Sequence, residues 1–367
     1  MPTKLTDNEI QKLIQLAQKT QWDYKLSLYE TDALTRINKS VKKVSDSITK
    51  KLKTISPDAI FSTDRMNALS DEMNKLTGAL QSQISNQIAD TAGVAGAASY
   101  TAQSEIASFG GLVPNFNNVA LSAAQMKSLV TTTPIGGKKL NQWVEKSFSY
   151  RLQDKFKSDI ISGMLLGESY PNMLKRFNKG IYSDFAGDME GLTRTYVQSV
   201  NVNAMNEVMK ANDDIVKGWK WSSVAENHTC VRCLSLDSAG IVYPINGGPE
   251  MPLHLNCRCF KDIITKTFKE LGVNIEEVKE NFKPYTIRGK IDPITGKLTP
   301  GKIGIGGNKT VSVGRFLGSY DNFFESLPKQ VQVQMLGPTR HGLWKSGMPL
   351  SDFTTKDGRQ KLIKELI

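Results

Sequence analysis

The sequence predicts a mainly α-helical, multi-domain protein with one small α+β module. Most of the chain carries apolar residues every three or four positions, which is the spacing of amphipathic helices. The stretch 218–263 instead reads as short strands and turns. All four cysteines fall inside thirty residues of that stretch, from Cys230 to Cys259.

Length and charge set the first limits on function. At roughly 150 residues per domain, 367 residues indicate two or three domains. A hydrophobic fraction of 39% is ordinary for a globular protein and excludes a disordered one. The formal net charge of +11 favours anionic partners, most commonly nucleic acid. Lysine occurs in scattered pairs such as Lys42-Lys43, without a dense arginine run, so we expect non-specific rather than sequence-specific contact.

The chain shows no targeting or membrane-spanning pattern. No apolar run follows Met1, so no signal peptide is expected. No stretch approaches the roughly 18 apolar residues of a membrane span. We therefore expect an intracellular protein made in a reducing compartment, where four cysteines do not build a disulfide scaffold.

The first third, 1–109, is predicted to be an N-terminal helical region. Thr6 and Glu9 form a capping box, and helical spacing continues over 26–52 and 66–88. The alanine-rich stretch 89–107 also favours helix, although Gly93 and Gly96 weaken that prediction. A Gly, Pro and Asn-rich loop at 110–118 is the first predicted boundary.

Helical patterns resume at Ser122 and continue to Met209. One buried face is predicted at i, i+4 spacing, with Trp143 close to it: Phe148, Leu152, Phe156, Ile160 and Met164. A helix is expected to end at Gly167, the next to start near Tyr170, and a further one to cover Gly187–Met209. Strands are predicted at Val216–Trp221 and Gly240–Tyr243.

The C-terminal part divides into three segments. Lys261–Phe282 is predicted to be helical. Residues 284–319 are rich in Gly and Lys and are either a flexible arm or a set of short hairpins. Residues 320–367 are predicted to return to helix as a tail, with Phe323, Phe324 and Trp344 in its core.

The cysteines have the spacing of a zinc site. Cys230 and Cys233 form a Cys-x-x-Cys knuckle, and a second group follows after about twenty residues: His254, Cys257 and Cys259. Thiolate and imidazole are ligands that suit zinc. Five candidate ligands compete for four positions, and His254 either replaces a cysteine or orients one. The predicted fold class is therefore mainly α with a small α+β zinc-stapled module. Two disulfides, or reduced thiols in an ordinary core, are the alternatives.

A structural zinc site is favoured over a catalytic one. Catalytic zinc keeps one position open for water, whereas ligands are in surplus here. The three histidines are His228, His254 and His341, and neither His228 nor His254 has an acid pair nearby. A metal-dependent nuclease with a histidine base is the enzymatic alternative. The glycines of 301–307 lack the Gly-Lys-Ser/Thr ending of a phosphate loop and are read as a loop.

These motifs together resemble the phage Mu F-like minor head proteins, the phage head morphogenesis family. The likeness covers 125–265 well and 320–350 loosely. Its motifs are an Arg-Thr pair with later asparagines, a Trp-containing strand, a Cys-x-x-Cys followed by a turn, and a Pro-x-His-x-x-Cys-Arg-Cys ending. Here they are Arg194-Thr195 with Asn203 or Asn206, Trp219-Lys220-Trp221, Cys230 to Cys233 with Leu236–Gly240, and Pro252–Cys259. Two departures are Tyr196, where the family often has Glu, and Leu255, where Pro is usual.

The resemblance implies a structural, non-enzymatic virion protein. It would lie inside the head near the portal vertex, after synthesis in the host cytoplasm, and act in head assembly and DNA packaging or delivery. Its implied partners are the portal protein, packaged double-stranded DNA and other head proteins, with no membrane. The implied family domain spans 119–283, with its Cys/His cluster at 228–260. A scaffold-associated chaperone that is lost from mature particles is a further alternative.

Overall fold

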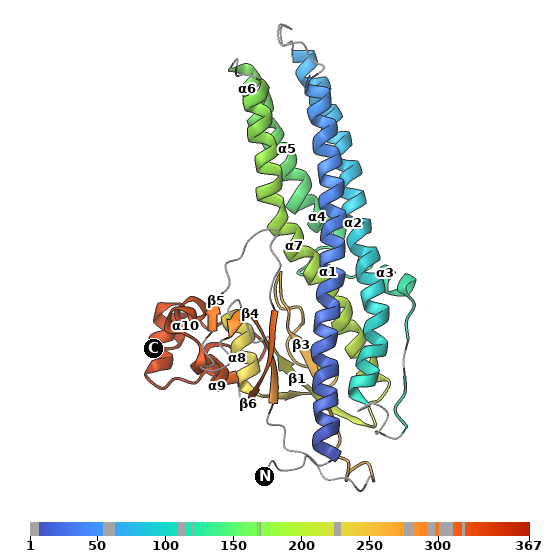
Figure 1. The fold of residues 1–367 in the computed structure, drawn as a ribbon, viewed down its shortest axis with the longest axis vertical. Helices are drawn as coiled ribbons and strands as arrows, with labels where there is room; N and C mark the ends of the chain where they lie inside the picture. The colour runs from blue at the N-terminus through green and yellow to red at the C-terminus, as the bar shows by residue number, and fades with distance from the viewer. Residues whose placement is uncertain are drawn as a thin grey trace.

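The computed structural model describes residues 7–53, 63–108, 113, 115–118, 120–166, 168, 170–223, 229–272, 274, 282–291, 298–300, 311–317 and 320–367. These residues are mainly helical, as predicted. Three long helices run side by side in an elongated bundle, with a smaller mixed region beside one end of it (Figure 1). They are α1 (Asp7–Lys53), α2 (Thr63–Ala107) and α7 (Tyr170–Lys210). Within the described chain, no helix is long and apolar enough to cross a membrane.

A fourth column of the bundle is built from short pieces joined end to end. It comprises α4 (Leu140–Val144), α5 (Tyr150–Phe156) and α6 (Ser162–Leu165), with π-helical turns at Glu145–Ser149 and Lys157–Ile161. The predicted buried face is confirmed at four positions, because Phe148, Leu152, Phe156 and Ile160 are each at most 1% exposed. The side chain of Met164 lies outside the described residues. The helix α3 (Ala123–Thr132) packs across α2 and starts at a capping box on Ser122.

One hydrophobic core joins α1, α2, the fourth column and α7. Its members recur at helical spacing, for example Ile37 and Val41 on α1, and Leu80, Ile84 and Ile88 on α2. Two glycines of α2, Gly93 and Gly96, lie at close approaches to neighbouring elements. A Cβ at Gly96 would lie 2.5 Å from Met126 Cε and 3.1 Å from Val200 Cβ. Close packing therefore explains why α2 continues through glycines that weaken isolated helices.

The small module begins where α7 ends. Its antiparallel sheet has the order β2-β1-β3, from β1 (Val216–Ser222), β2 (Val242–Tyr243) and β3 (Phe260–Thr265). The strands predicted at 216–221 and near 243 are confirmed. The stretch between them is more helical than predicted, because α8 occupies Val231–Ala239.

Two further helix predictions need correction. The stretch predicted as a helix at 261–282 holds β3, because Phe260–Thr265 pairs with β1 along its length and buries Phe260 and Lys261. The helix predicted over Gly187–Met209 is not a separate helix. It is the C-terminal part of α7, which begins at Tyr170, where the preceding helix was predicted to begin.

The remaining chain forms a second small sheet and a helical tail. The sheet has the order β5-β4-β6, from β4 (Phe282–Ile291), β5 (Leu298–Pro300) and β6 (Val311–Leu317). Of the two alternatives for 284–319, its described residues therefore correspond to hairpin strands. The tail contains α9 (Tyr320–Ser326), α10 (Lys329–Leu336) and α11 (Pro338–Lys345), followed by 3₁₀ turns at Leu350–Phe353 and Ile363–Glu365.

Candidate metal centre

The first half of the candidate centre is the start of α8. Cys230 is the N-cap residue of this helix, and its Sγ accepts a hydrogen bond from the backbone N–H of Cys233 at 3.5 Å. Both thiols therefore lie in the first turn, where the free N–H groups of the helix favour negative charge. Cys233 is 2% exposed, while Cys230 is half-buried.

The second half is a tight loop from His254 to Cys259. The backbone N–H of Cys257 donates to the carbonyl of His254 at 3.2 Å, and Asn256 adopts a left-handed conformation with φ of 67°. Asparagine tolerates this conformation better than most residues. The Nδ1 of His254 lies 2.7 Å from the carbonyl oxygen of Leu255. Donation through Nδ1 leaves the lone pair of Nε2 free for a metal.

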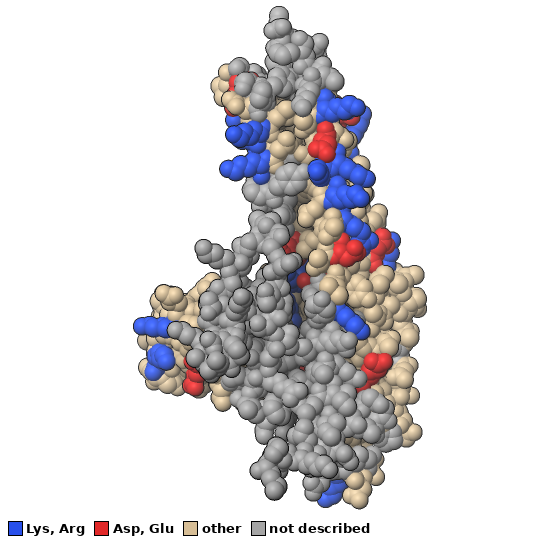
Figure 2. Space-filling model, viewed as in Figure 1, with Lys and Arg blue, Asp and Glu red and all other residues tan. Residues whose placement is uncertain are grey.

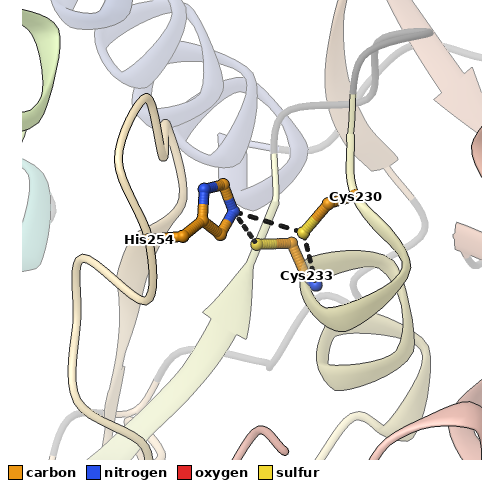
Figure 3. A group of neighbouring side chains, drawn as sticks. All are labelled: Cys230, Cys233 and His254. Carbon is orange, nitrogen blue, oxygen red and sulfur yellow. Dashed lines mark hydrogen bonds between the residues drawn. The ribbon is translucent and has the colours of Figure 1, made fainter. Parts of the chain in front are cut away.

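The two halves meet at the ring of His254. Its Nε2 lies 3.2 Å from Cys230 Sγ and 3.4 Å from Cys233 Sγ, so it points between the two sulfurs (Figure 3). Cys233 Sγ in turn lies 4.0 Å from Cys257 Sγ. Tetrahedral zinc, with bonds of about 2.3 Å to sulfur and about 2.0 Å to nitrogen, separates neighbouring ligand atoms by about 3.5–3.8 Å. The observed spacings bracket these values.

The ligand atoms form two overlapping triads. The first comprises Cys230, Cys233 and His254, and the second comprises Cys233, Cys257 and Cys259. Within each triad the ligand atoms lie within 4.8 Å of one another. All four cysteines are free thiols, so the disulfide alternative does not describe this structure.

Electrostatics already favour charge at three of these positions. Hydrogen bonds with Cys233 and then with His254 lower the pKa of Cys230 to about 4, against the opposing effect of burial. The hydrogen bond with Cys230 raises the pKa of His254 to about 9. The pKa of Cys257 is lowered, mainly by a hydrogen bond with Cys233. Metal coordination requires thiolates and would take over the role of the histidine proton.

The other two thiols behave differently. The hydrogen bond with Cys230 is the largest cause that raises the pKa of Cys233, because that arrangement leaves the proton on Cys233. Burial raises the pKa of Cys259, which is 3% exposed. Of the two cysteines in the second loop, Cys257 is thus the one prepared to be a thiolate.

Helix α7 holds the second loop in place through side chains on one of its faces. The backbone N–H of Asn256 donates to Thr195 Oγ1 at 2.7 Å, and Gln198 Nε2 donates to the carbonyl of Cys259 at 2.6 Å. Arg194 donates to the side-chain oxygen of Asn256. The loop is therefore anchored at both ends of the Asn256–Cys259 segment.

Arg194 is itself fixed by two carboxylates. Its guanidinium lies 3.1 Å from Glu30 of α1 and 2.6 Å from Glu190 of α7, and its side chain is only 7% exposed. Burial lowers the pKa of this arginine, but the two carboxylates outweigh it, and the pKa stays above its ordinary value. Arg194 thus connects both α1 and α7 with the loop from His254 to Cys259.

The structure brings together all five predicted ligand residues. His228 lies outside the described residues, and His341 lies in the tail, where its Nε2 is 3.3 Å from Gln332 Oε1. The positioning roles of Gln198, Asn256 and Glu30 were missed by sequence reasoning. Only Asn256 carried a local signal, since an asparagine inside a tight ligand loop often takes the left-handed conformation.

Comparison of the chain with protein-family models, curated proteins and solved structures found no match.

Proposed function

We propose that this chain is a structural minor head protein of a tailed bacteriophage, in which one Zn²⁺ ion staples the loop-rich module. The observation that carries the structural part is the convergence of Cys230, Cys233 and His254 on one point, with further buried thiols beside them. Cys257 supplies the fourth ligand in this proposal, because its sulfur lies near Cys233 and its pKa is lowered. A closed set of four protein ligands leaves no position for substrate water.

The assignment to a phage head rests on the resemblance of the sequence motifs. The structure adds support by giving those motifs one physical task. The Arg194-Thr195 pair holds Asn256, which lies inside the Pro-x-His-x-x-Cys-Arg-Cys segment. Two motifs that are far apart in the sequence thus contact each other in the structure, as expected if they form one structural unit.

Contact with packaged DNA is the second part of the proposal. Lysine and arginine side chains gather at the end of the bundle where α1 ends and α7 begins (Figure 2). The exposed lysines of α1 there are Lys39, Lys42, Lys43, Lys50 and Lys51, and those of α7 are Lys175 and Lys179. Lysines spread over a helical surface bind phosphates without reading bases. The proposed partners are thus double-stranded DNA, the portal protein and other head proteins.

Mass spectrometry of purified virions tests the location. We expect to find the chain in mature particles in few copies. After co-expression with the portal protein, we expect the two proteins to co-purify at low salt. Absence from virions would remove the structural assignment and favour an assembly chaperone. Presence in virions without portal binding would contradict the proposed position at the portal vertex.

A plasmid-binding experiment tests the DNA contact and separates this proposal from a nuclease. We expect full-length protein to retard plasmid DNA and to leave it intact with Mg²⁺ or Zn²⁺. Reversing three charges with Lys42→Glu, Lys43→Glu and Lys50→Glu should weaken binding roughly tenfold or more at low salt, because fewer counterions are released.

A matched variant controls for net charge. Lys329, Lys356 and Lys364 are exposed on the tail, away from the bundle end. Changing these three to glutamate alters the net charge equally and should leave DNA affinity within about threefold. Equal losses in both variants would contradict a localised DNA surface. Cleavage that disappears in His254→Ala would instead support the nuclease.

A further inference from the structure

A pocket of about 390 Å³ lies between the bundle and the small module. One wall is α7, another is the loop Ile245–Pro252 that follows β2, and β3 forms the base with Lys261. The end of α3 and the turn after it complete the rim through Val130 and Ile135. The pocket is therefore built by four separate parts of the chain, and its walls combine apolar and polar side chains.

Two lysines, Lys210 and Lys261, line the pocket together with one exposed carboxylate, that of Glu250. Lys261 is 8% exposed, and its Nζ lies 4.1 Å from the centre of the Trp219 ring. Among the residues that the structure describes, no carboxylate lies within ion-pair distance of Lys261. Lys210 also lines the pocket, and its Nζ forms an ion pair with Glu207 at 2.7 Å. A buried ammonium ion is costly without a negative partner, and a cation–π contact offsets only part of that cost.

Two further polar atoms on the pocket wall lack a partner. The hydroxyl oxygen of Tyr196 and the side-chain oxygen of Asn206 are buried and accept or donate no hydrogen bond within the described chain. Both residues line the pocket. Buried polar atoms are satisfied in the great majority of native structures, so two such atoms in a pocket that also holds Lys261 favour a polar ligand there.

We propose that this pocket binds a phosphate group. Lys261 and Lys210 would face its oxygens, and the Tyr196 hydroxyl would donate a hydrogen bond to one of them. Asn206 would accept a hydrogen bond from a hydroxyl of the same ligand. Phosphate offers three strong acceptor oxygens, enough to meet both lysines and the tyrosine hydroxyl at once, whereas a carboxylate offers two. The source is either free phosphate or the phosphate of a nucleotide, whose body would meet the apolar wall.

Isothermal titration of full-length protein, with inorganic phosphate, deoxyadenosine monophosphate and acetate in turn, tests the proposal. We expect saturable binding of phosphate and at least tenfold weaker binding of acetate. Tighter binding of the nucleotide than of phosphate would identify a nucleotide as the ligand, and equal binding would identify free phosphate. Failure of both phosphate compounds to bind, or equal binding of acetate, would overturn the proposal.

Three variants locate the binding. Lys261→Met should reduce phosphate affinity at least tenfold. Lys220→Met is the matched control, because Lys220 lies on the neighbouring strand β1 at a position that alternates to the opposite face of the sheet from Lys261. This control should keep the affinity of the original protein. Equal affinity in Lys261→Met and Lys220→Met would place the bound phosphate elsewhere and contradict the proposal.

Tyr196→Phe keeps the proposal testable should Lys261→Met fail to fold. Because the hydroxyl has no partner in the protein, its removal should leave the unfolding temperature without ligand unchanged or slightly raised. Its phosphate affinity should nevertheless fall severalfold. Unchanged affinity, or a loss of stability without any ligand, would show that the hydroxyl serves the fold rather than a ligand.

Discussion

At the scale of single residues, the candidate ligands of the metal centre are held in place by side chains that are not candidate ligands themselves. Thr195 accepts from the backbone of Asn256, and Arg194 holds the Asn256 side chain. The Nδ1 of His254 is occupied by a backbone carbonyl, which aims Nε2 at the sulfurs. Such outer contacts commonly contribute 10–100-fold to metal affinity. The Arg-Thr pair of the sequence motif thus has a physical explanation that does not require catalysis.

The proposed ligand set predicts that substitutions of the two cysteines in the same loop, Cys257 and Cys259, have different effects on metal binding. We expect elemental analysis to find about one zinc per chain in the original protein. Cys257→Ala should lose the metal and unfold at a lower temperature, because metal binding here contributes folding free energy. Cys259→Ala should retain the metal, because Cys259 is the buried thiol whose pKa is raised.

The comparison of these two variants is decisive because both remove a buried sulfur. Each creates a small cavity, so the loss of packing is similar and only the loss of metal differs. Zinc lost from Cys259→Ala and kept by Cys257→Ala would reverse our choice of fourth ligand. A metal-free original protein whose melting temperature resists a strong chelator would contradict the zinc proposal altogether.

At the scale of helices and strands, the spacing of apolar residues correctly predicted the helices whose buried face is defined by their own sequence. The apolar positions of 148–160 repeat every four residues, and all four described members are buried as one face. The long helices α1 and α2 were likewise predicted from spacing, including the alanine-rich part of α2. The contribution of Gly96 was not predictable, because its benefit lies in close contacts with Met126 and Val200, which are 30 and 104 residues away.

The wrong helix prediction at 261–282 shows a place where a distant partner decides the local structure. Phe260–Thr265 is a strand because β1 offers a complete edge for pairing, with register from Ser222–Phe260 to Val216–Thr265. Nothing inside the segment reveals that edge. The helix α8 was missed because cysteines dominated the interpretation of 230–239, although Cys230 is an N-cap and Gly240 a left-handed C-cap. Only the C-cap glycine was visible in the sequence, because cysteine is not among the residues preferred at N-caps.

The candidate site was more predictable than the fold around it. All five predicted ligands meet in space because ligand chemistry and spacing are encoded locally, in Cys230-x-x-Cys233 and in the segment from His254 to Cys259. The phosphate pocket had no local signal. Its polar groups come from α7 and β3, and only the fold brings Tyr196 near Lys261.

At the scale of the whole molecule, α8 connects the candidate metal centre with the C-terminal tail. One end of this helix carries Cys230 and Cys233, while its Val231 and Leu234 pack in the core of the tail with Phe324, Leu350 and Phe353. Polar contacts reinforce the connection. Arg232 Nε donates to the carbonyl of Gly358 at 2.6 Å, and Ser238 Oγ donates to the carboxylate of Asp321 at 2.8 Å.

Metal removal should therefore loosen the tail as well as the metal loop. We expect a strong chelator to increase hydrogen exchange in the loop 254–259, in α8 and in the tail 320–367. The core of α1 and α2 should keep its protection, because it packs independently of α8. Hydrogen-exchange mass spectrometry of full-length protein, with and without chelator, provides the measurement.

A variant that acts on the tail alone shows the direction of this coupling. Arg232→Ala removes the contact with Gly358 but no candidate ligand, so it should raise exchange in the tail by the equivalent of about 1–2 kcal/mol while zinc stays bound. If chelation raised exchange in the loop and α8 but left the tail as protected as before, the metal would stabilise only its own loop. If both treatments release the tail, the ion acts through α8 as the structural link between the helical bundle and the tail 320–367.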